Sequence, residues 1–364
     1  RLTILPSDTY CKKGVIIYIF IGIMQRNFVL TDLMKTGHHQ DIESFISMHS
    51  LPGQSFEMTG EYYTLHGYDL DAYDRKFAII DRSAIGKFHP SKNTEYCLEL
   101  ERRKQLLHSQ GFVFILATPW ESDENIKNLN LYPYQTDELV WSGGVSWFWF
   151  YMFEKHNNKK FAFDHSQKTY DYLYLNKMER EHRQKLFHKI SQTKLLDTSL
   201  YTNWPDKKLP REYELPWLQQ YPLYGMDQDI YEKPYNDTKY SLISETNDNN
   251  TDVFITEKLW KAIIAQHIFV VHGNHLYLQK LREIGFKTFS KYVDESYDLE
   301  SNPDKRIEKI VATCEKLNKQ NWQDLYLQTI ELRKNNYNTF FNEEKLSEQI
   351  NKTLSLFFEF ADSR

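Results

Sequence analysis

The chain is 364 residues long, with 41% hydrophobic residues, 26% charged residues and a net charge of −5 at pH 7. This composition is typical of a soluble globular protein, and the length suits two domains of ordinary size. The acidic balance argues against a nucleic-acid-binding protein, which normally carries a basic excess.

Cysteine usage and the first apolar run bear on the compartment. Cys11, Cys97 and Cys314 lie far apart, without the paired spacing of a disulfide framework or a zinc site. We therefore expect a cytoplasmic protein, or one held at a membrane by a segment absent from this chain. The apolar run at residues 15–24 is shorter than the about 20 residues that span a bilayer, and no small-residue cleavage site follows it. We expect a buried strand there and no membrane span in this chain.

The first half of the chain has the pattern of an α/β layer. Residues 76–83 and 111–120 are rich in β-branched and aromatic residues, which predicts buried parallel strands. Residues 95–110 have the pattern of a helix, and strand, helix, strand is the order of such a layer. A very aromatic stretch at 141–160 ends in a polar turn. We therefore place a first domain at residues 1–165.

A second α/β domain is predicted at residues 166–340. It opens with a strand near residue 170, followed by a helix through Leu186, Phe187 and Ile190. Residues 203–237 are rich in Pro, Tyr and Trp, which predicts a loop. The later predicted elements are strands at 240–244, 268–272 and 287–289, and helices at 256–266, 275–283, 303–335 and 343–360. Residues 341–364 are assigned to a C-terminal helix.

The most informative stretch is an Asn-rich loop that leads into Thr256, Glu257 and Lys258 at the start of an apolar helix. Thr256 is a good N-cap, which puts Glu257 and Lys258 in the first turn, where backbone N–H groups are unpaired. A helix N-terminus at the carboxyl end of a sheet is a natural anion site. We expect Lys258 to meet a diphosphate and Glu257 a sugar or ribose hydroxyl. The alternative is ordinary helix capping beside a solvated lysine.

This stretch resembles the nucleotide-sugar motif of the family 10 glycosyltransferases, the α-1,3-fucosyltransferases. The likeness covers residues 240–290, with a weaker one at 170–204. It is specific, because a polar loop, Thr-Glu-Lys, an apolar helix, a strand and a Gly follow in the same order.

The resemblance assigns roles residue by residue. Glu257 and Lys258 match the family's Glu-Lys pair, which contacts the donor sugar and its phosphates. Phe254 matches the family's aromatic residue before that pair, and Glu245 matches the Glu of its Phe-Glu-Asn segment. Thr246 stands where the family has Asn, the loop is longer, and the Pro of the family's Val-Pro-Val run is absent. The donor base and sugar therefore stay open, with GDP-fucose as the first expectation.

An earlier segment, residues 175–186, resembles the family's strand-to-helix element with a phosphate-binding Arg. Arg180 and Arg183 are three residues apart and so share one helix face. A guanidinium can grip diphosphate oxygens with two parallel hydrogen bonds. We choose Arg183 first and Arg180 second. The alternative is a solvated, charged helix face.

The resemblance also implies a fold and a mechanism. The fold is α/β of GT-B type, with two Rossmann-like domains facing a cleft: the C-terminal domain holds the nucleotide-sugar and the N-terminal domain the glycan acceptor. Transfer is expected to invert the anomeric centre without a metal, and it needs a general base. Glu121 or Glu124 is the candidate base, in a loop after a buried strand; an acidic surface loop is the alternative. No tightly bound cofactor and no nucleic-acid partner are expected.

Two other functions compete with this prediction. A metal-dependent GT-A type transferase would use an Asp-x-Asp motif, and those letters occur at residues 69–71 and 227–229, neither after a convincing strand. A catalytically inactive carbohydrate-binding or structural protein on the same fold is the other. It predicts that Glu257, Lys258 and Arg183 lie scattered on separate surfaces.

Overall fold

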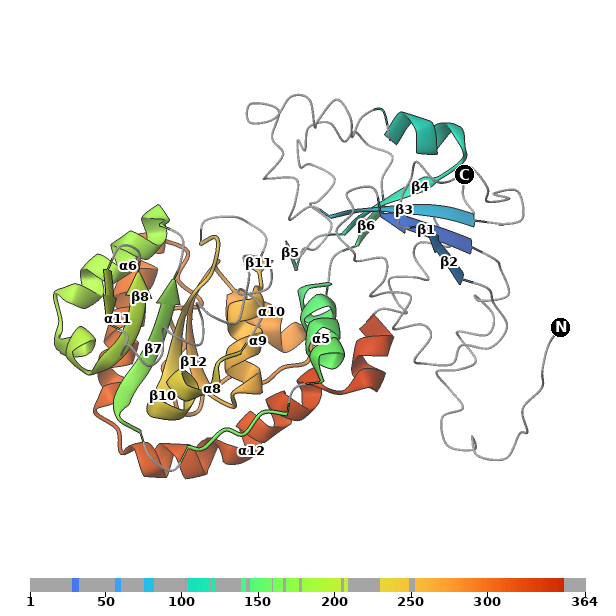
Figure 1. The fold of residues 1–364 in the computed structure, drawn as a ribbon. Helices are drawn as coiled ribbons and strands as arrows, with labels where there is room; N and C mark the ends of the chain where they lie inside the picture. Colours follow the sequence, from blue (N-terminus) through green and yellow to red (C-terminus); the bar gives the residue numbers. More distant parts are fainter. Residues whose placement is uncertain are drawn as a thin grey trace, which may run out of the picture. The chain divides into compact units, whose positions relative to one another are not determined.

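A computed structural model of the chain divides into two compact units (Figure 1). The first unit holds Arg1–Thr118, Glu124–Ser142 and Glu344–Arg364, and the second holds Pro119–Asp123 and Gly143–Glu343. The residues that the structure describes are 28–32, 56–59, 75–81, 102, 104–117, 120–121, 139–141, 145–158, 160–165, 168–176, 179–203, 206–208, 230–248 and 253–349.

The first unit contains a parallel sheet. Its strands are β1 (Phe28–Asp32), β2 (Phe56–Thr59), β3 (Arg75–Asp81), β4 (Val113–Ala117) and β6 (Leu139–Trp141). They lie in the order β2-β1-β3-β4-β6, and every neighbouring pair is parallel. The predicted strands at 76–83 and 111–120 are confirmed as β3 and β4. Residues 104–109 of the predicted helix between them are helical, with Leu107 buried.

The second unit contains a sheet that is parallel except at one edge. Its strands are β7 (Tyr170–Asn176), β8 (Ser199–Asn203), β9 (Asp206–Lys208), β10 (Thr238–Ser244) and β12 (Ile268–His272). They lie in the order β12-β10-β7-β8-β9, and only β9 is antiparallel to its neighbour. Every residue of β12 is buried, which is typical of parallel sheets covered on both faces.

Both sheets have the same topology. When the parallel strands are numbered in chain order, the first sheet runs 2-1-3-4-5 and the second 2-1-3-4. This is a doubly wound, Rossmann-like order. The expectation of two Rossmann-like α/β units is therefore confirmed. In the second sheet the strand order reverses between β7 and β10, and this reversal is the topological switch point.

Helices cover both faces of the second sheet. They are α5 (Val145–Asn157), α6 (Glu181–Ser191), the 3-10 helix η5 (Lys194–Thr198), α8 (Glu232–Asp237), α9 (Glu257–Ile264), α10 (Tyr277–Glu283), α11 (Pro303–Asn318) and α12 (Trp322–Phe340). Helix α6 packs on α11, whereas α9 packs on α5 and α12 (Figure 1). Asn321 caps α12 through hydrogen bonds from the backbone N–H groups of Gln323 and Asp324, so the predicted helix at 303–335 is two helices.

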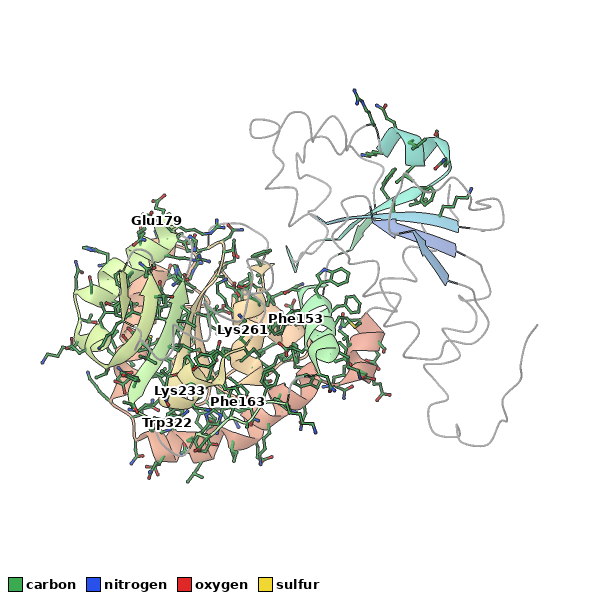
Figure 2. All side chains as sticks on the ribbon, in the orientation of Figure 1. Phe153, Phe163, Glu179, Lys233, Lys261 and Trp322 are labelled. Atoms are coloured by element: carbon green, nitrogen blue, oxygen red, sulfur yellow. The ribbon has the colours of Figure 1, made fainter. Side chains whose placement is uncertain are left out.

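An aromatic cluster attaches α5 to the second unit. Trp147 is almost fully buried, with its ring centroid 5.0 Å from that of Phe286 and 6.5 Å from that of Trp260. Its indole N–H donates to the carbonyl oxygen of Phe340 at 3.0 Å. Figure 2 marks Phe153 on α5 beside these packed elements. The aromatic stretch is therefore used largely for core packing.

This packing moves the division between the units. The second unit begins its main segment at residue 143, whereas the sequence places the second domain at 166–340. Residues 344–364 group with the first unit, whereas the sequence treats 341–364 as a separate tail. The reason is that α5 contributes its apolar face to the core around α9 and α12, a contact that sequence spacing does not reveal.

The predicted strand at residues 287–289 is wrong. The backbone N–H of Lys287 donates to Asn336 Oδ1 at 2.8 Å, and Asn336 Nδ2 donates to the Lys287 carbonyl oxygen at 2.8 Å. A side-chain amide on α12 thus replaces a neighbouring strand as the partner of this backbone. Phe286 and Phe289 are buried and supply the apolar signal that resembles a strand.

Three predicted segments lie partly or wholly outside the residues that the structure describes. The predicted loop at 203–237 contains β9 and α8, and its residues 209–229 lie outside the described part of the chain. The run at 15–24 and the tail beyond 349 lie outside it as well. Within the described ranges, none of the helices has the length and apolar character needed to cross a membrane.

Asn336→Ala is expected to lower the free energy of unfolding by about 1–3 kcal/mol, because it removes the side-chain partner of two part-buried backbone groups of Lys287. Urea unfolding followed by tryptophan fluorescence measures the change. Asn338→Ala, an exposed position on the same helix, is the control and is expected to change stability by less than about 0.5 kcal/mol. Equal losses from the two variants would contradict the role given to Asn336.

Candidate functional site

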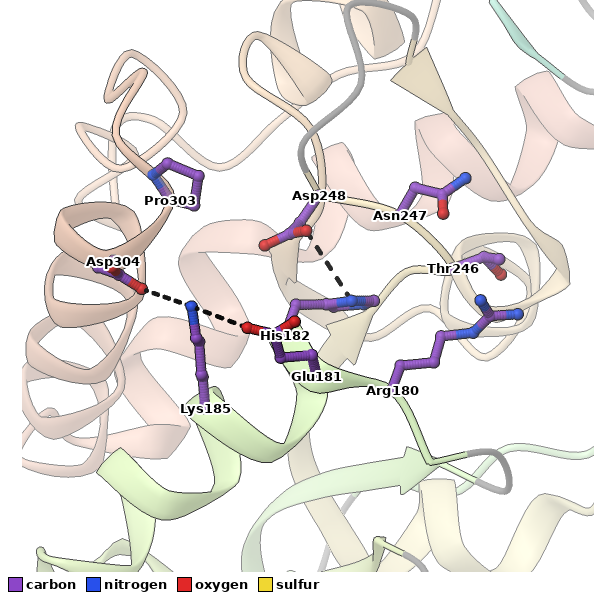
Figure 3. Close-up of a pocket in the computed structure, with 9 residues that line it drawn as sticks. All are labelled: Arg180, Glu181, His182, Lys185, Thr246, Asn247, Asp248, Pro303 and Asp304. Atoms are coloured by element: carbon purple, nitrogen blue, oxygen red, sulfur yellow. Dashed lines mark ion pairs between the residues drawn. The ribbon is translucent and has the colours of Figure 1, made fainter.

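A hollow lies at the switch point of the second sheet, where β7 and β10 end (Figure 3). Ligands of doubly wound sheets bind outside the carboxyl ends of the strands at this point. The volume of the hollow is about 370 Å³, within the range of small-molecule pockets. Its lining comes from the start of α6, the loop after β10 and the start of α11, and consists of Arg180, Glu181, His182, Lys185, Thr246, Asn247, Asp248, Pro303 and Asp304.

Glu245 holds the loop after β10 in place. It is fully buried, and its carboxylate accepts hydrogen bonds from the backbone N–H of Thr256 at 3.1 Å, from the Thr256 hydroxyl and from the Tyr277 hydroxyl at 2.6 Å. Burial raises the pKa of this carboxyl above its ordinary value. The sequence predicts that Glu245 contacts the nucleotide-sugar. The structure instead gives it a positioning role beneath the site, because all of its surface is used within the protein.

The two candidate arginines differ in how far their side chains are buried. Arg183 is buried, and its Nε and Nη2 donate to the carbonyl oxygen of Glu245 at 3.3 and 3.0 Å. Burial lowers the pKa of its guanidinium. Arg180 is exposed, lines the hollow, and extends on the side of Thr246 (Figure 3). The sequence prefers Arg183, which is buried, whereas Arg180 lines the hollow.

Glu257 and Lys258 form an ion pair at the start of α9. The Thr256 hydroxyl caps the helix by accepting from the backbone N–H of Lys258. Lys258 Nζ lies 2.9 Å from Glu257 Oε1 and 3.3 Å from Thr256 Oγ1. Burial favours the neutral carboxyl of Glu257, but Lys258 and Lys261 outweigh it and hold its pKa below the ordinary value. The side chains of Glu257 and Lys258 are partly exposed, at 28% and 22%.

A short antiparallel pair of strands brings two predicted segments together. Strand β11 (Val253–Phe254) pairs with β5 (Trp120–Glu121), with Phe254 opposite Trp120 and Val253 opposite Glu121. The backbone of the candidate base Glu121 therefore lies beside the strand that leads into Thr256. Phe254 itself is buried. Glu124 and the Asp-x-Asp letters at 69–71 and 227–229 lie outside the described residues.

Two histidines and an aspartate, which the sequence analysis did not select, lie in and behind the wall of the hollow. Asp248 Oδ1 lies 3.8 Å from His182 Nδ1, and its Oδ2 lies 3.5 Å from Nε2 of the fully buried His272. Burial lowers the pKa of both imidazoles. Burial raises the pKa of Asp248, but His272, His182 and Arg306 outweigh it and bring the pKa below its ordinary value. Asp248 is thus a carboxylate beside two neutral rings.

Arg306 fixes this wall to α11. It is buried, and its Nη1 donates to the carbonyl oxygens of Asp248 and Gly273, at the ends of the loops after β10 and β12. Its Nε donates to the carbonyl oxygen of Glu300 at 2.8 Å. In the described ranges no cluster of three or more His, Cys, Asp or Glu side chains is arranged to hold a metal ion.

The predicted donor residues form one connected region of the second unit. Arg183 bonds to Glu245, Glu245 bonds to Thr256, and Thr256 bonds to Lys258, which pairs with Glu257. Arg180 and Thr246 line the adjoining hollow. Hydrogen bonds and an ion pair thus link these residues, although Arg183 is buried and Glu257 and Lys258 are not among the residues that line the hollow.

Comparisons with known proteins add little to this geometry. No protein-family model matches the chain, and no curated protein matches it. Among solved structures, the chain is similar to a mutant of T4 phage BGT in complex with UDP-glucose, at 10% sequence identity and a TM-score of 0.46, over 90% of this chain and 99% of that one. A similarity at that level carries no weight for the fold or the function. The resemblance to α-1,3-fucosyltransferases at residues 240–290 therefore stays a prediction from the motif.

Glu245→Ala is expected to destabilise the second unit by about 1–3 kcal/mol for each buried donor that it leaves unpaired. Urea unfolding measures this loss. The matched control is Glu283→Ala, an exposed glutamate on α10 whose ion pair with Lys280 contributes at most about 1 kcal/mol. A stability of Glu245→Ala equal to that of the control would contradict the positioning role.

Proposed function

We propose that the chain is a glycosyltransferase of GT-B type, which moves a sugar from a nucleoside diphosphate donor to a glycan hydroxyl. The observation that carries the proposal is the location of the donor motif. Arg180 and Thr246 line the hollow at the carboxyl ends of β7 and β10, where a doubly wound sheet binds its ligand. Hydrogen bonds between Glu245 and Thr256 and between Thr256 and Lys258 connect this region to the start of α9.

The charges at this crevice suit a diphosphate. Arg180 is the N-cap residue of α6, and its side chain makes no capping hydrogen bond to the first turn of that helix, where backbone N–H groups lack intrahelical partners. Lys258 lies in the first turn of α9. Two cationic side chains and two helix N-termini stabilise the charge that develops on a leaving diphosphate. We propose that they do so in place of a metal ion.

The acceptor hydroxyl needs a base while the anomeric carbon gains positive character. Glu121 is the first candidate, because the pairing of β5 with β11 ties its backbone to the donor motif. Glu124 is the second. A base on the face opposite the departing diphosphate gives inversion at the anomeric centre.

The donor is proposed to be GDP-fucose, which is what the motif resemblance implies. The replacement of the family's Asn by Thr246 concerns this choice directly, because Thr246 lines the hollow. A hydroxyl and a methyl group there offer fewer hydrogen bonds than an amide. UDP-sugars and other GDP-sugars are therefore included in the test.

Thermal denaturation with GDP, UDP, GDP-fucose and UDP-glucose tests donor binding. A ligand that binds only the folded state stabilises it by about 2.7 kcal/mol at 100 times its Kd. One nucleotide class is expected to raise the Tm of the wild-type protein, and Arg180→Ala and Lys258→Ala are expected to reduce that shift. Lys189→Ala, which removes a cation at the far end of α6, is the control and keeps the shift. No shift with any nucleotide would overturn the proposal in favour of an inactive protein on this fold.

Glu121→Gln and Glu124→Gln identify the base. The variant that lacks the base is expected to transfer sugar about 10²–10⁴-fold more slowly, because proton abstraction is lost. Transfer of radiolabelled sugar from the donor that the thermal panel selects to a glycan array measures the rate. The thermal shift with the same donor is expected to stay as in the wild type, which separates chemistry from binding. Full activity in both variants would exclude this loop as the source of the base.

A further inference from the structure

The wall of the hollow holds two hydrogen-bond acceptors that face each other without a donor between them. They are Nδ1 of His182 and Oδ1 of Asp248, 3.8 Å apart. Both residues line the hollow, and Figure 3 shows the His182 ring and the Asp248 carboxylate turned toward one another. At ordinary hydrogen-bond geometry a donor and an acceptor would lie about 2.7–3.2 Å apart.

The hydrogen bond on the other side of the ring determines the proton on His182. Its Nε2 lies 2.9 Å from the carbonyl oxygen of Glu245. A carbonyl oxygen only accepts, so Nε2 carries the proton and donates. In the neutral ring, Nδ1 then has a lone pair and no proton. That lone pair is directed at the Asp248 carboxylate.

The Asp248 carboxylate is also short of donors. The residue is only 7% exposed, and among the described residues its carboxylate oxygens pair with His182 at 3.8 Å and with His272 at 3.5 Å. The buried Arg306 donates to the backbone carbonyl oxygen of Asp248. A largely buried carboxylate whose described partners lie 3.5 and 3.8 Å away is costly, because it has lost water and gained only long, weak hydrogen bonds in return. A ligand that brings O–H groups removes this cost.

Three other charged groups of the hollow pair with one another. Lys185 lies between Glu181 and Asp304, at 3.3 and 3.4 Å from their carboxylate oxygens. Arg180 is a cation and suits an anionic group of the ligand. The His182 and Asp248 pair has the opposite character: a carboxylate repels phosphate and accepts from hydroxyls. The hollow thus has a cationic side and an acceptor side.

We propose that His182 and Asp248 bind the 2′,3′-diol of the ribose of the donor nucleotide, one hydroxyl to each acceptor. Two acceptors need two protons, and a ribose presents two O–H groups on adjacent carbons. In a nucleotide the ribose is attached to the phosphates, which is consistent with an acceptor pair close to Arg180 in the same hollow. The inference rests on the proposed function, since it assigns a part of the nucleotide to this wall.

The test compares nucleotides that differ only in the ribose. Calorimetric titration of the full chain with GDP and UDP, and with their 2′-deoxy and 3′-deoxy analogues, gives the affinity of each. In the wild type, a nucleotide that lacks the ribose hydroxyl that donates to Asp248 is expected to bind about 10- to 100-fold more weakly, because that hydrogen bond is made to a charged group. In Asp248→Ala the ratio of ribo to deoxy affinity is expected to fall toward one, with Asp248→Asn between the two.

Asp304→Asn is the matched control. It removes a carboxylate from the same hollow, but one that is paired with Lys185, so the ratio of ribo to deoxy affinity is expected to equal that of the wild type. Because the ratio is formed within each variant, a change in stability does not produce it; circular dichroism and Tm establish that each variant is folded.

Three results would overturn the proposal, and they are distinguishable. Equal binding of ribo and deoxy nucleotides by the wild type would show that the diol is not recognised. A ratio that persists in Asp248→Ala would place the recognition on other residues. Absence of binding by both GDP and UDP would overturn the proposed function together with this inference.

Discussion

The carboxylate of Glu245 is the point at which three parts of the second unit meet. Glu245 directly follows β10. Its carboxylate accepts hydrogen bonds from the backbone N–H and the hydroxyl of Thr256, the N-cap of α9, and from the hydroxyl of Tyr277 on α10. Its backbone carbonyl receives Arg183 and His182 from α6. The position of α9 relative to α6 therefore depends on one buried residue. Because a carboxylate only accepts, all the surrounding groups must be donors, and this fixes the orientation of each one.

That orientation determines the polarity of the crevice. His182 must donate through Nε2, so its other nitrogen is left as an acceptor on the wall of the hollow. Arg183 is used to hold the loop, and the neighbouring Arg180 is left on the surface. The acceptors and the exposed cation are thus different side chains that line the same hollow. A ligand with an anionic end and a hydroxylated part meets groups of matching character in a single orientation.

The sequence predicts the local features of the site. It does not predict which side chains are buried or which distant segments contact one another. Thr256 as N-cap, and Glu257 and Lys258 in the first turn, are confirmed because capping depends on adjacent residues. The spacing of Arg180 and Arg183 places them on one helix face, but it cannot tell which is buried, because that depends on the carbonyl of Glu245. Asp248, in the loop after β10, meets His272, the last residue of β12, and no pattern within either segment indicates this contact. The strand predicted at 287–289 fails for the same reason, since its partner is a side chain from α12.

Because β5 pairs with β11, cutting the chain at residue 143 does not give a complete second unit. Residues 119–123 belong to the second unit although the chain returns to the first unit for residues 124–142. The polypeptide thus passes from one unit to the other at four places instead of at one linker. A fragment that begins at residue 143 would carry the whole second sheet and yet lack the partner of Val253 and Phe254. The loop that leads into α9 would then end in an unpaired edge, and supplying residues 119–123 as a separate peptide would restore the missing strand by complementation.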